Sequence, residues 1–175
     1  YLFIFANSCL CYLQLVVLAI HQWFWLSTYD RNVCYFSFSI CKFYFVCLEQ
    51  KNIEVETILK ETDLVLEVDT DLLEQVLINL VVNAIEAVKD KEQPRIILTA
   101  YVSNNNNRKI VIKVADNGYG MAEELLDKIF IPFFSTKKSG SGIGLSLCKQ
   151  IMMLHKGNIH VHSVEGEGTA FQLQF

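Results

Sequence analysis

Four polar side chains recur along one stretch of the sequence at the spacing of a helical turn. Gln75, Asn79 and Asn83 follow one another every four residues, and Glu86 continues the series. Residues three and four apart lie on one face of a helix. Asparagine is a poor helix former and is costly to bury without partners. The stripe is therefore either a solvated or internally satisfied face, or the wall of a site for a polar ligand.

The residues between these amides predict the helix that must carry them. Apolar side chains fall at spacings of three and four through residues 71–90, as the buried face of an amphipathic helix requires. They are Leu72, Leu73, Val76, Leu77, Leu80, Ala84 and Val88. Asp71 and Glu74 have the spacing of a capping box at the start of this helix. Pro94 prevents the helix from continuing much beyond Lys91.

A carboxylate and two glycines follow a predicted strand at residues 109–115. Asp116 ends that strand, and Gly118 and Gly120 occupy alternate positions after it. Glycines allow the backbone to turn sharply and to approach a flat ligand, while the carboxylate accepts a hydrogen bond. Taken alone, a tight turn explains the same pattern.

Aromatic residues, cations and glycines then follow in one segment. The aromatic segment at residues 129–134, which includes Phe133, is followed by Ser135, Thr136 and the two cations Lys137 and Lys138. A surface loop that buries aromatic rings in the core would produce the same pattern. Three glycines next lead into a predicted helix, namely Gly140, Gly142 and Gly144, with Leu145 after them. Exposed amides at a helix N-terminus suit a phosphate group. The spacing matches neither a Walker loop nor a dinucleotide-binding fingerprint.

The remaining elements are predicted to form a sheet. Alternating residues predict strands at 53–59 and 64–68 joined by a turn at 60–63, and a hairpin of 95–102 and 109–115 around a polar loop at 103–108. A last hairpin, 157–164 and 169–175 around the turn at 165–168, would close the sheet. His155, His160 and His162 fall in this part of the chain, and we interpret them as structural.

The composition divides the chain at about residue 48. Residues 1–48 contain three charged side chains but hold fourteen of the twenty-one aromatic residues and five of the six cysteines. Residues 49–175 resemble an ordinary soluble domain with a net charge of about −5, so they offer no basic surface for nucleic acid. Cys148 is their single cysteine, which argues against a disulfide framework.

The apolar segment allows three interpretations. Residues 2–20 are long enough to span a bilayer, and Trp23 and Trp25 resemble an interfacial aromatic belt, so residues 2–25 are a candidate membrane anchor. Arg31, Lys42 and Lys51 would then place the next domain on the cytoplasmic side. The segment could instead be non-native sequence or buried structure. Because the first residue is Tyr1, we expect a fragment of a longer protein.

Together, the order and spacing of the motifs are specific. Residues 53–175 resemble the ATP-binding catalytic domain of bacterial sensor histidine kinases, within the superfamily of gyrase, Hsp90 and MutL. The resemblance rests on LINLVVNAIEAV, DNGYG, FIPFFSTK, GSGIGL and GEGTAF. It implies an α+β fold of the Bergerat type, a two-layer sandwich. A mixed, mostly antiparallel sheet of about five strands would be covered on one face by about three helices. The domain would occupy residues 49–175, after the apolar segment at 1–48.

The resemblance also implies a role for each motif in binding ATP and Mg²⁺. Asn83 would ligate the magnesium, an ion that favours hard oxygen ligands, with Asn79 beside the phosphates and Glu86 near the same pocket. Asp116 would accept the adenine amino group, with Gly118 and Gly120 permitting close approach. Lys137 would reach the terminal phosphate, which makes Asn79 and Lys137 the candidate catalytic residues. The other nucleotide-binding residues implied are Phe133, Thr136, Gly140, Gly142, Gly144, Leu145 and Thr169, the last supporting Asp116 through its hydroxyl.

The implied reaction transfers the γ-phosphoryl group of ATP to a histidine on a separate helical domain, with a response regulator downstream. No phosphoacceptor motif follows His21, so autophosphorylation within this chain is not expected, and a homodimer would need a dimerisation hairpin supplied from elsewhere. The alternatives are an ATP-hydrolysing domain like those of gyrase or MutL, and a non-catalytic nucleotide-binding fragment. Those hydrolases carry a glutamate base where Asn79 stands. The expected location is the cytoplasmic face of the bacterial inner membrane if residues 1–29 are a native anchor, and otherwise the cytoplasm.

Overall fold

The computed structural model describes residues 34–35, 52–60, 64–103, 108–137 and 140–175. The predicted anchor at residues 2–25, positions 61–63 and 104–107 of two predicted turns, and Lys138 lie outside the described residues. Among the residues that are described, no helix is both long and apolar enough to cross a membrane.

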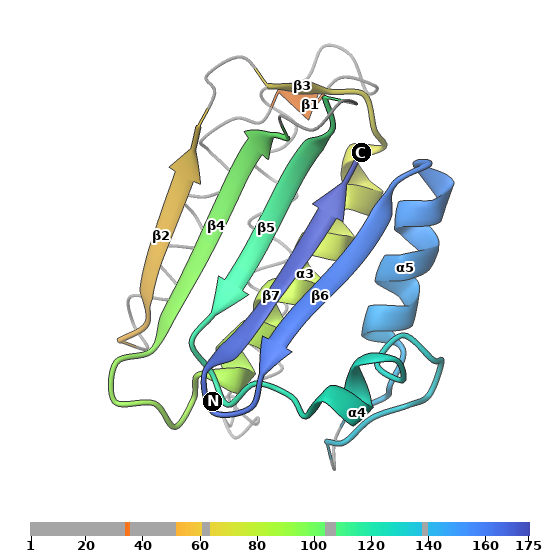
Figure 1. The fold of residues 1–175 in the computed structure, drawn as a ribbon. Coiled ribbons are helices and arrows are strands. Elements are labelled where there is room, and N and C mark those ends of the chain that lie inside the picture. The colour runs from red at the N-terminus through yellow and green to blue at the C-terminus, as the bar shows by residue number, and fades with distance from the viewer. Residues whose placement is uncertain (1–33, 36–51, 61–63, 104–107, 138–139) are drawn as a thin grey trace, which may run out of the picture.

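Five strands form the main sheet in the order β2, β4, β5, β7, β6 (Figure 1). Their bounds are β2 Glu54–Leu59, β4 Arg95–Val102, β5 Ile110–Asp116, β6 Asn158–Val164 and β7 Gly168–Gln174. The β2 strand runs parallel to β4, and all other neighbours are antiparallel. The mixed, mostly antiparallel five-stranded sheet predicted from the sequence is therefore confirmed.

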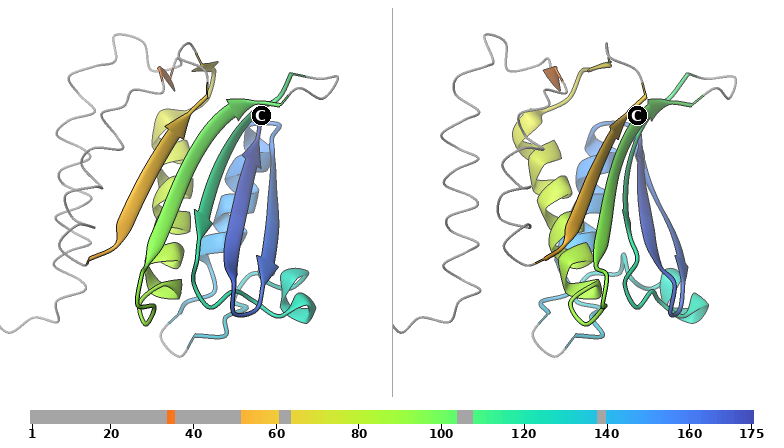
Figure 2. Two further views of the ribbon diagram at one scale, coloured as in Figure 1. Left: turned by 60° about the vertical axis from the view of Figure 1, so that its left-hand side comes forward. Right: turned by 90° about the vertical axis from the view of Figure 1, so that its left-hand side faces the viewer.

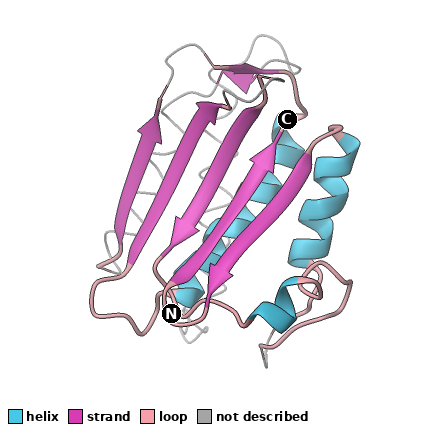
Figure 3. Cartoon of the chain, viewed as in Figure 1, coloured by secondary structure: helices cyan, strands magenta, loops and turns pink. Residues whose placement is uncertain are grey.

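Helices cover one face of this sheet. α3 (Thr70–Ala87) packs on β5 and β7, and α5 (Gly144–Leu154) packs on β6 and beside α3. Side views show both helices on the same side of the sheet (Figure 2). The short helix α4 (Glu123–Leu126) lies at the end of the sheet near β6, where several loops gather (Figure 3). The two-layer α+β sandwich is confirmed.

The strand register sorts the helix-facing side chains into rows across the sheet. Two rows are largely apolar and pack into the core with α3 and α5. They are Leu59, Ala100, Ile112, Leu173 and Ile159, and Thr57, Leu98, Val114, Phe171 and Val161. The third row begins with Val55 and Ile96 but then becomes polar at Asp116, Thr169 and Ser163. Since apolar burial stabilises the fold, this change to polar residues inside the sandwich marks a site.

The predicted strand at residues 64–68 is wrong in extent and in its partner. Only β3 (Val65–Leu66) is a strand, and it pairs antiparallel with β1 (Cys34–Tyr35) instead of joining the main sheet. The alternating pattern has another cause: Leu66 and Val68 are buried in the core while the chain runs extended toward α3. Alternation reports which side chains are buried, and it does not report hydrogen bonding to a neighbouring strand.

The predicted helix at residues 71–90 is present, but its ends differ. Asp69, not Asp71, is the N-cap, because its carboxylate accepts the Leu72 N–H at 3.1 Å. Asp71 lies in the first turn, so the predicted capping box with Glu74 is wrong. The helix ends at Ala87, well before Pro94, and the Ala87 carbonyl accepts the Tyr119 N–H at 3.2 Å. The end of α3 is therefore fixed by the loop after β5.

His155 connects the two long helices at their other ends. Its Nε2 accepts the Asp69 N–H at 3.0 Å, and its Nδ1 lies 2.8 Å from the Ile151 carbonyl oxygen. Both contacts are satisfied by the neutral ring with the proton on Nδ1. This placement agrees with the structural role predicted for His155.

Candidate functional site

A cavity of about 300 Å³ opens between the C-terminal half of α3 and the loops at the lower end of the sheet in Figure 1. Its walls come from α3, the end of β5, the segments on both sides of α4, the start of α5, and β7. Twelve of the fourteen predicted site residues line it: Asn79, Asn83, Glu86, Asp116, Gly120, Thr136, Lys137, Gly140, Gly142, Gly144, Leu145 and Thr169. Residues far apart in the sequence are thus brought to one place.

The amide stripe of α3 forms one wall. The side-chain amide nitrogen of Asn79 donates to the backbone carbonyl of Gln75 at 3.0 Å, which fixes the orientation of the Asn79 side chain. Asn83 and Glu86 follow along the helix, and their oxygens converge on the ammonium of Lys137. The Lys137 nitrogen lies 3.0 Å from Asn83 Oδ1 and 2.6 Å from Glu86 Oε2. The stripe therefore presents oxygens that already hold a cation.

Asp116 stands on the opposite side of the site, at the end of β5. Its Oδ1 accepts the Gly118 N–H at 2.8 Å. Burial raises the pKa of this carboxyl, while hydrogen bonds from the backbone of Gly118 and Thr169 and the charge of Lys91 act in the opposite direction. A partly buried carboxylate that lines the cavity is suited to accept a hydrogen bond from a ligand donor.

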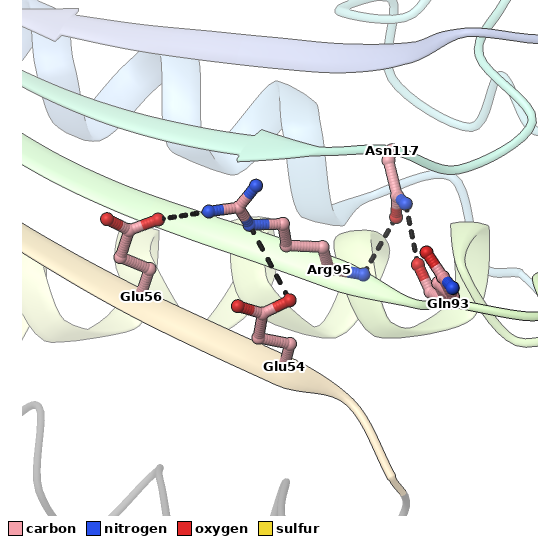
Figure 4. Close-up of polar contacts among 5 residues, drawn as sticks. All are labelled: Glu54, Glu56, Gln93, Arg95 and Asn117. Carbon is pink, nitrogen blue, oxygen red and sulfur yellow. Dashed lines mark hydrogen bonds and ion pairs between the residues drawn. The ribbon is translucent and has the colours of Figure 1, made fainter.

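Asn117 fixes the backbone next to this carboxylate. Its Oδ1 accepts the Arg95 N–H at 2.8 Å, and its Nδ2 donates to the Gln93 carbonyl at 2.7 Å (Figure 4). The Asn117 N–H also donates to the Arg95 carbonyl at 3.2 Å. Arg95 in turn pairs with Glu54 and Glu56 of the edge strand β2 (Figure 4). The end of β5 is thereby tied to β4, and β4 is tied to the edge of the sheet.

Two glycines are required where the backbone closes around the cavity. Gly120 has φ of +66°, and a Cβ there would lie 1.9 Å from the Val164 carbonyl oxygen. Gly142 has φ of +68°, and a Cβ there would lie 2.5 Å from the carbonyl carbon of Phe133. Side-chain-bearing residues rarely adopt this left-handed conformation. Any larger residue at either position must move the backbone that shapes the site.

The two adjacent phenylalanines differ in orientation. Phe133 has φ of +65° and is 78% exposed, and it does not line the cavity. Phe134 lines the cavity instead. The Phe133 N–H donates to the Gly142 carbonyl at 3.0 Å, so this residue contributes its backbone to the loop. Gly118 also lies outside the lining and contributes through the hydrogen bond from its N–H to Asp116.

The Thr169 hydroxyl is engaged away from Asp116. Its Oγ1 lies 2.9 Å from Ser163 Oγ, which donates to the Gly168 carbonyl at 3.0 Å and accepts the Met121 N–H at 2.8 Å. Because the Ser163 hydroxyl donates its proton to the Gly168 carbonyl, the Thr169 hydroxyl is the donor in its hydrogen bond with Ser163. The sequence predicts that the Thr169 hydroxyl supports Asp116. In the structure it is the backbone of Thr169 that forms a hydrogen bond with the Asp116 carboxyl.

Sequence reasoning missed most of the apolar lining. Met121, Leu125 and Ile129 line the cavity along with Val82, Phe134 and Phe171. The first three recur every four residues directly after the Asp116 turn, a spacing that could have identified them as one face of a helical segment. The cavity thus combines apolar side chains and a partly buried carboxylate with a cation-binding end. It suits a ligand with a flat apolar part that carries a hydrogen-bond donor, and an anionic part.

Comparison with known proteins identifies the family of this chain. The profile of the histidine kinase-, DNA gyrase B- and HSP90-like ATPases matches residues 68–175. The chain belongs to this family. This profile, together with the sensor kinase relatives and the solved kinase domain described next, confirms the resemblance to the ATP-binding domain of sensor histidine kinases.

Relatives within this ATPase family include several sensor kinases. Sporulation kinase D of Bacillus subtilis is 38% identical over 119 residues, which are 67% of this chain and 22% of that protein. The histidine-protein kinase AtoS of Escherichia coli is 41% identical over 105 residues, which are 60% of this chain and 17% of that protein. The chain therefore spans about a fifth of the length of these curated relatives.

A solved structure shares the ATPase fold. The catalytic domain of the histidine kinase ThkA superposes with a TM-score of 0.66 at 35% identity, covering 77% of this chain and 85% of that domain. The cavity therefore lies in a fold shared with a histidine kinase catalytic domain.

Proposed function

We propose that this chain is the ATP-binding catalytic part of a sensor histidine kinase. It would donate the γ-phosphoryl group of Mg-ATP to a histidine on a separate helical domain. The observation that carries the proposal is one cavity in which a partly buried carboxylate, Asp116, and a group of cation-holding oxygens on α3 lie on different walls. Adenine carries an exocyclic amino group, and the phosphates carry the negative charge, so ATP matches both ends.

At the adenine end, Asp116 accepts the amino group through the oxygen that Gly118 does not use. Burial of this carboxylate strengthens such a hydrogen bond because the surroundings screen it less than water does. Met121, Leu125 and Phe134 supply apolar surface for the ring. The tight approach at Gly120 keeps the loop close to the sheet.

At the phosphate end, the donor set on α3 fits a magnesium ion. Asn83 Oδ1 and Glu86 Oε2 are hard oxygen donors, and in the structure they bind the ammonium of Lys137 as a stand-in cation. Mg²⁺ is usually held by one or two protein oxygens together with substrate phosphates. Bound there, it would neutralise phosphate charge during transfer. Gly140, Gly142 and Gly144 leave room around the phosphates, and Lys137 would pair with the terminal one.

Positioning supplies most of the catalysis in phosphoryl transfer, because the protein needs no covalent step of its own. The chain would hold the γ-phosphate at the open end of the cavity for attack by a nucleophile from outside.

The side chain at position 79 favours transfer to a protein over hydrolysis. Asn79 Nδ2 is bound to the Gln75 carbonyl, and a Cβ built on Gly144 would lie 3.1 Å from Asn79 Oδ1. An amide at this position cannot take a proton from water, so it cannot act as the general base of a hydrolase. Release of phosphate from ATP without an acceptor should therefore be slow, and rapid turnover would support the hydrolase instead.

The partners follow from this reaction. A helical domain carrying the acceptor histidine must come from another part of the protein or another chain, and a response regulator would receive the phosphoryl group next. One similar structure, 29% identical with a TM-score of 0.67 over 95% of this chain and 47% of that one, is described as histidine kinase ThkA in complex with the response regulator TrrA. ATP and such regulators are cytoplasmic, so we place this domain in the cytoplasm, at the inner face of the membrane if residues 1–29 are a native anchor.

The metal role is tested by titrating the folded chain with a non-hydrolysable ATP analogue, with and without Mg²⁺. We expect Asn83→Ala to abolish the effect of Mg²⁺ on affinity while the thermal unfolding transition is retained. The matched control is Asn158→Ala, an exposed asparagine on the edge strand β6. An Asn83→Ala variant with the same Mg²⁺ effect as the parent would contradict the assignment.

A further inference from the structure

Lys137 occupies the place where the proposed function puts a metal ion. Its ammonium contacts Asn83 Oδ1 at 3.0 Å and Glu86 Oε2 at 2.6 Å. The Lys137 side chain is 27% exposed and that of Glu86 is 47% exposed, so the pair lies at the mouth of the cavity. The lysine comes from the loop before α5, more than fifty residues along the chain from its partners.

The Lys137 ammonium and a divalent cation would both bind to the oxygens of Asn83 and Glu86. A magnesium ion requires oxygen ligands at about 2.0–2.1 Å in a nearly octahedral arrangement. Asn83 Oδ1 and Glu86 Oε2 both accept hydrogen bonds from the Lys137 ammonium. A metal ion bound to the same two oxygens would lie close to that ammonium, and the two positive charges would repel each other. Each cation therefore weakens the binding of the other at this position.

We propose that Lys137 competes with the divalent cation for Asn83 and Glu86, so that the metal binds well only together with the nucleotide. The phosphates offer Lys137 a new anionic partner, which frees both oxygens for the metal. Nucleotide and metal thereby raise each other's affinity, as linkage between two ligands requires. This inference rests on the proposed function, and it assigns Lys137 a positioning role in the nucleotide-free state.

The test measures binding of Mn²⁺ to the nucleotide-free chain by the loss of the free-ion signal in electron paramagnetic resonance. The variant is Lys137→Met, which keeps most of the side-chain volume and removes the charge. Loss of one partly exposed ion pair and of one repulsive charge should tighten Mn²⁺ binding about tenfold. Lys137→Gln serves as a second variant, and thermal unfolding verifies that each variant is folded.

Two controls separate local competition from overall charge. Lys113→Met makes the same change in net charge on β5, at a position on the sheet face away from the helices, and should leave Mn²⁺ affinity unchanged. Adding Glu86→Gln to Lys137→Met should cancel the gain, because a metal ligand is lost. Equal Mn²⁺ affinity of the parent and both Lys137 variants would overturn the inference, as would an equal gain in Lys113→Met.

Nucleotide binding distinguishes this inference from the proposed function. If the parent binds the ATP analogue with Mg²⁺ but neither Lys137 variant gains Mn²⁺ affinity, the competition is refuted and the proposed function stands. If the parent binds no nucleotide, the proposed function is refuted. The Mn²⁺ comparison decides the competition in either case, because it requires no nucleotide.

Discussion

Replacing Asp116 by asparagine should weaken nucleotide binding and stabilise the nucleotide-free fold at the same time. Asp116 Oδ1 already accepts the Gly118 N–H at 2.8 Å. In Asp116→Asn the amide oxygen is expected to keep that bond, because a buried N–H without an acceptor is costly. The amide nitrogen would then face the adenine amino group, so that two donors meet where a donor and a charged acceptor met before.

The size of the affinity loss follows from the kind of bond that is removed. A hydrogen bond to a charged group contributes about 1.5–3 kcal/mol, which corresponds to about a 10- to 150-fold loss of affinity. The stability effect has the opposite sign. Burial raises the pKa of Asp116, so the folded chain holds the proton more tightly than the unfolded chain does. The associated stability is present at low pH and is lost as the pH rises through the raised pKa.

Calorimetry with the ATP analogue and urea unfolding across a pH series measure the two effects. At neutral pH we expect Asp116→Asn to unfold at higher urea than the parent, with the difference shrinking as the pH falls through the raised pKa of Asp116. Asp90→Asn, an exposed aspartate beyond the end of α3, is the matched control and should change neither quantity. An Asp116→Asn variant with the nucleotide affinity of the parent would refute the assignment of Asp116 to adenine.

Three further predictions concern the fold around the site, and thermal or urea unfolding measures each of them. Gly120→Ala should lower the free energy of unfolding by about 2–5 kcal/mol, because it combines left-handed strain with a clash against the Val164 backbone. Gly166→Ala, with φ of +85° and open space around its Cβ, should lower it by only about 1–2 kcal/mol. Equal losses would show that the close approach of Gly120 to Val164 is unimportant. Asn117→Ala removes the acceptor for the Arg95 N–H and should cost about 1–3 kcal/mol, and an unchanged stability would contradict its anchoring role. Leu80→Ala in the core should cost about 2–5 kcal/mol, against less than about 0.5 kcal/mol for the 72% exposed Leu154; similar losses at both would contradict the described packing.

The elements with strong periodicity could be predicted from the sequence. The strand predicted at 95–102 is β4, and those predicted at 109–115, 157–164 and 169–175 differ from β5, β6 and β7 by one residue at their ends. The helix that carries Asn79 and Asn83 was also placed within a few residues of its ends. In each case one face is buried, so the chain must place apolar residues at a fixed period.

Where several residues satisfy the same local rule, the sequence cannot select among them. Asp69, Thr70 and Asp71 all have side chains that can cap a helix. In the structure Asp69 is the cap, and it follows the buried Val68 and donates its N–H to His155. Leu154 fits the apolar period of α5 but lies at its exposed end. The choice depends on tertiary packing that lies beyond the local pattern.

Long-range geometry decided the parts of the site that the sequence left open. Phe133 and Phe134 are identical residues next to each other in the sequence. Because Phe133 has a positive φ, the ring of Phe134 lines the cavity and that of Phe133 does not. The contact of Lys137 with Asn83 and Glu86 joins segments more than fifty residues apart. Neither feature has a signal in local spacing, because both depend on how the loop before α5 closes over α3.

ATP binding is tested most directly by calorimetric titration of the folded chain with a non-hydrolysable ATP analogue in the presence of Mg²⁺. We predict one bound nucleotide per chain, with an affinity in the micromolar to millimolar range usual for such sites. Removal of Mg²⁺ by a chelator should cause a marked loss of affinity. Absence of any binding heat from a sample that shows a cooperative unfolding transition would contradict the assignment of an ATP site to this chain.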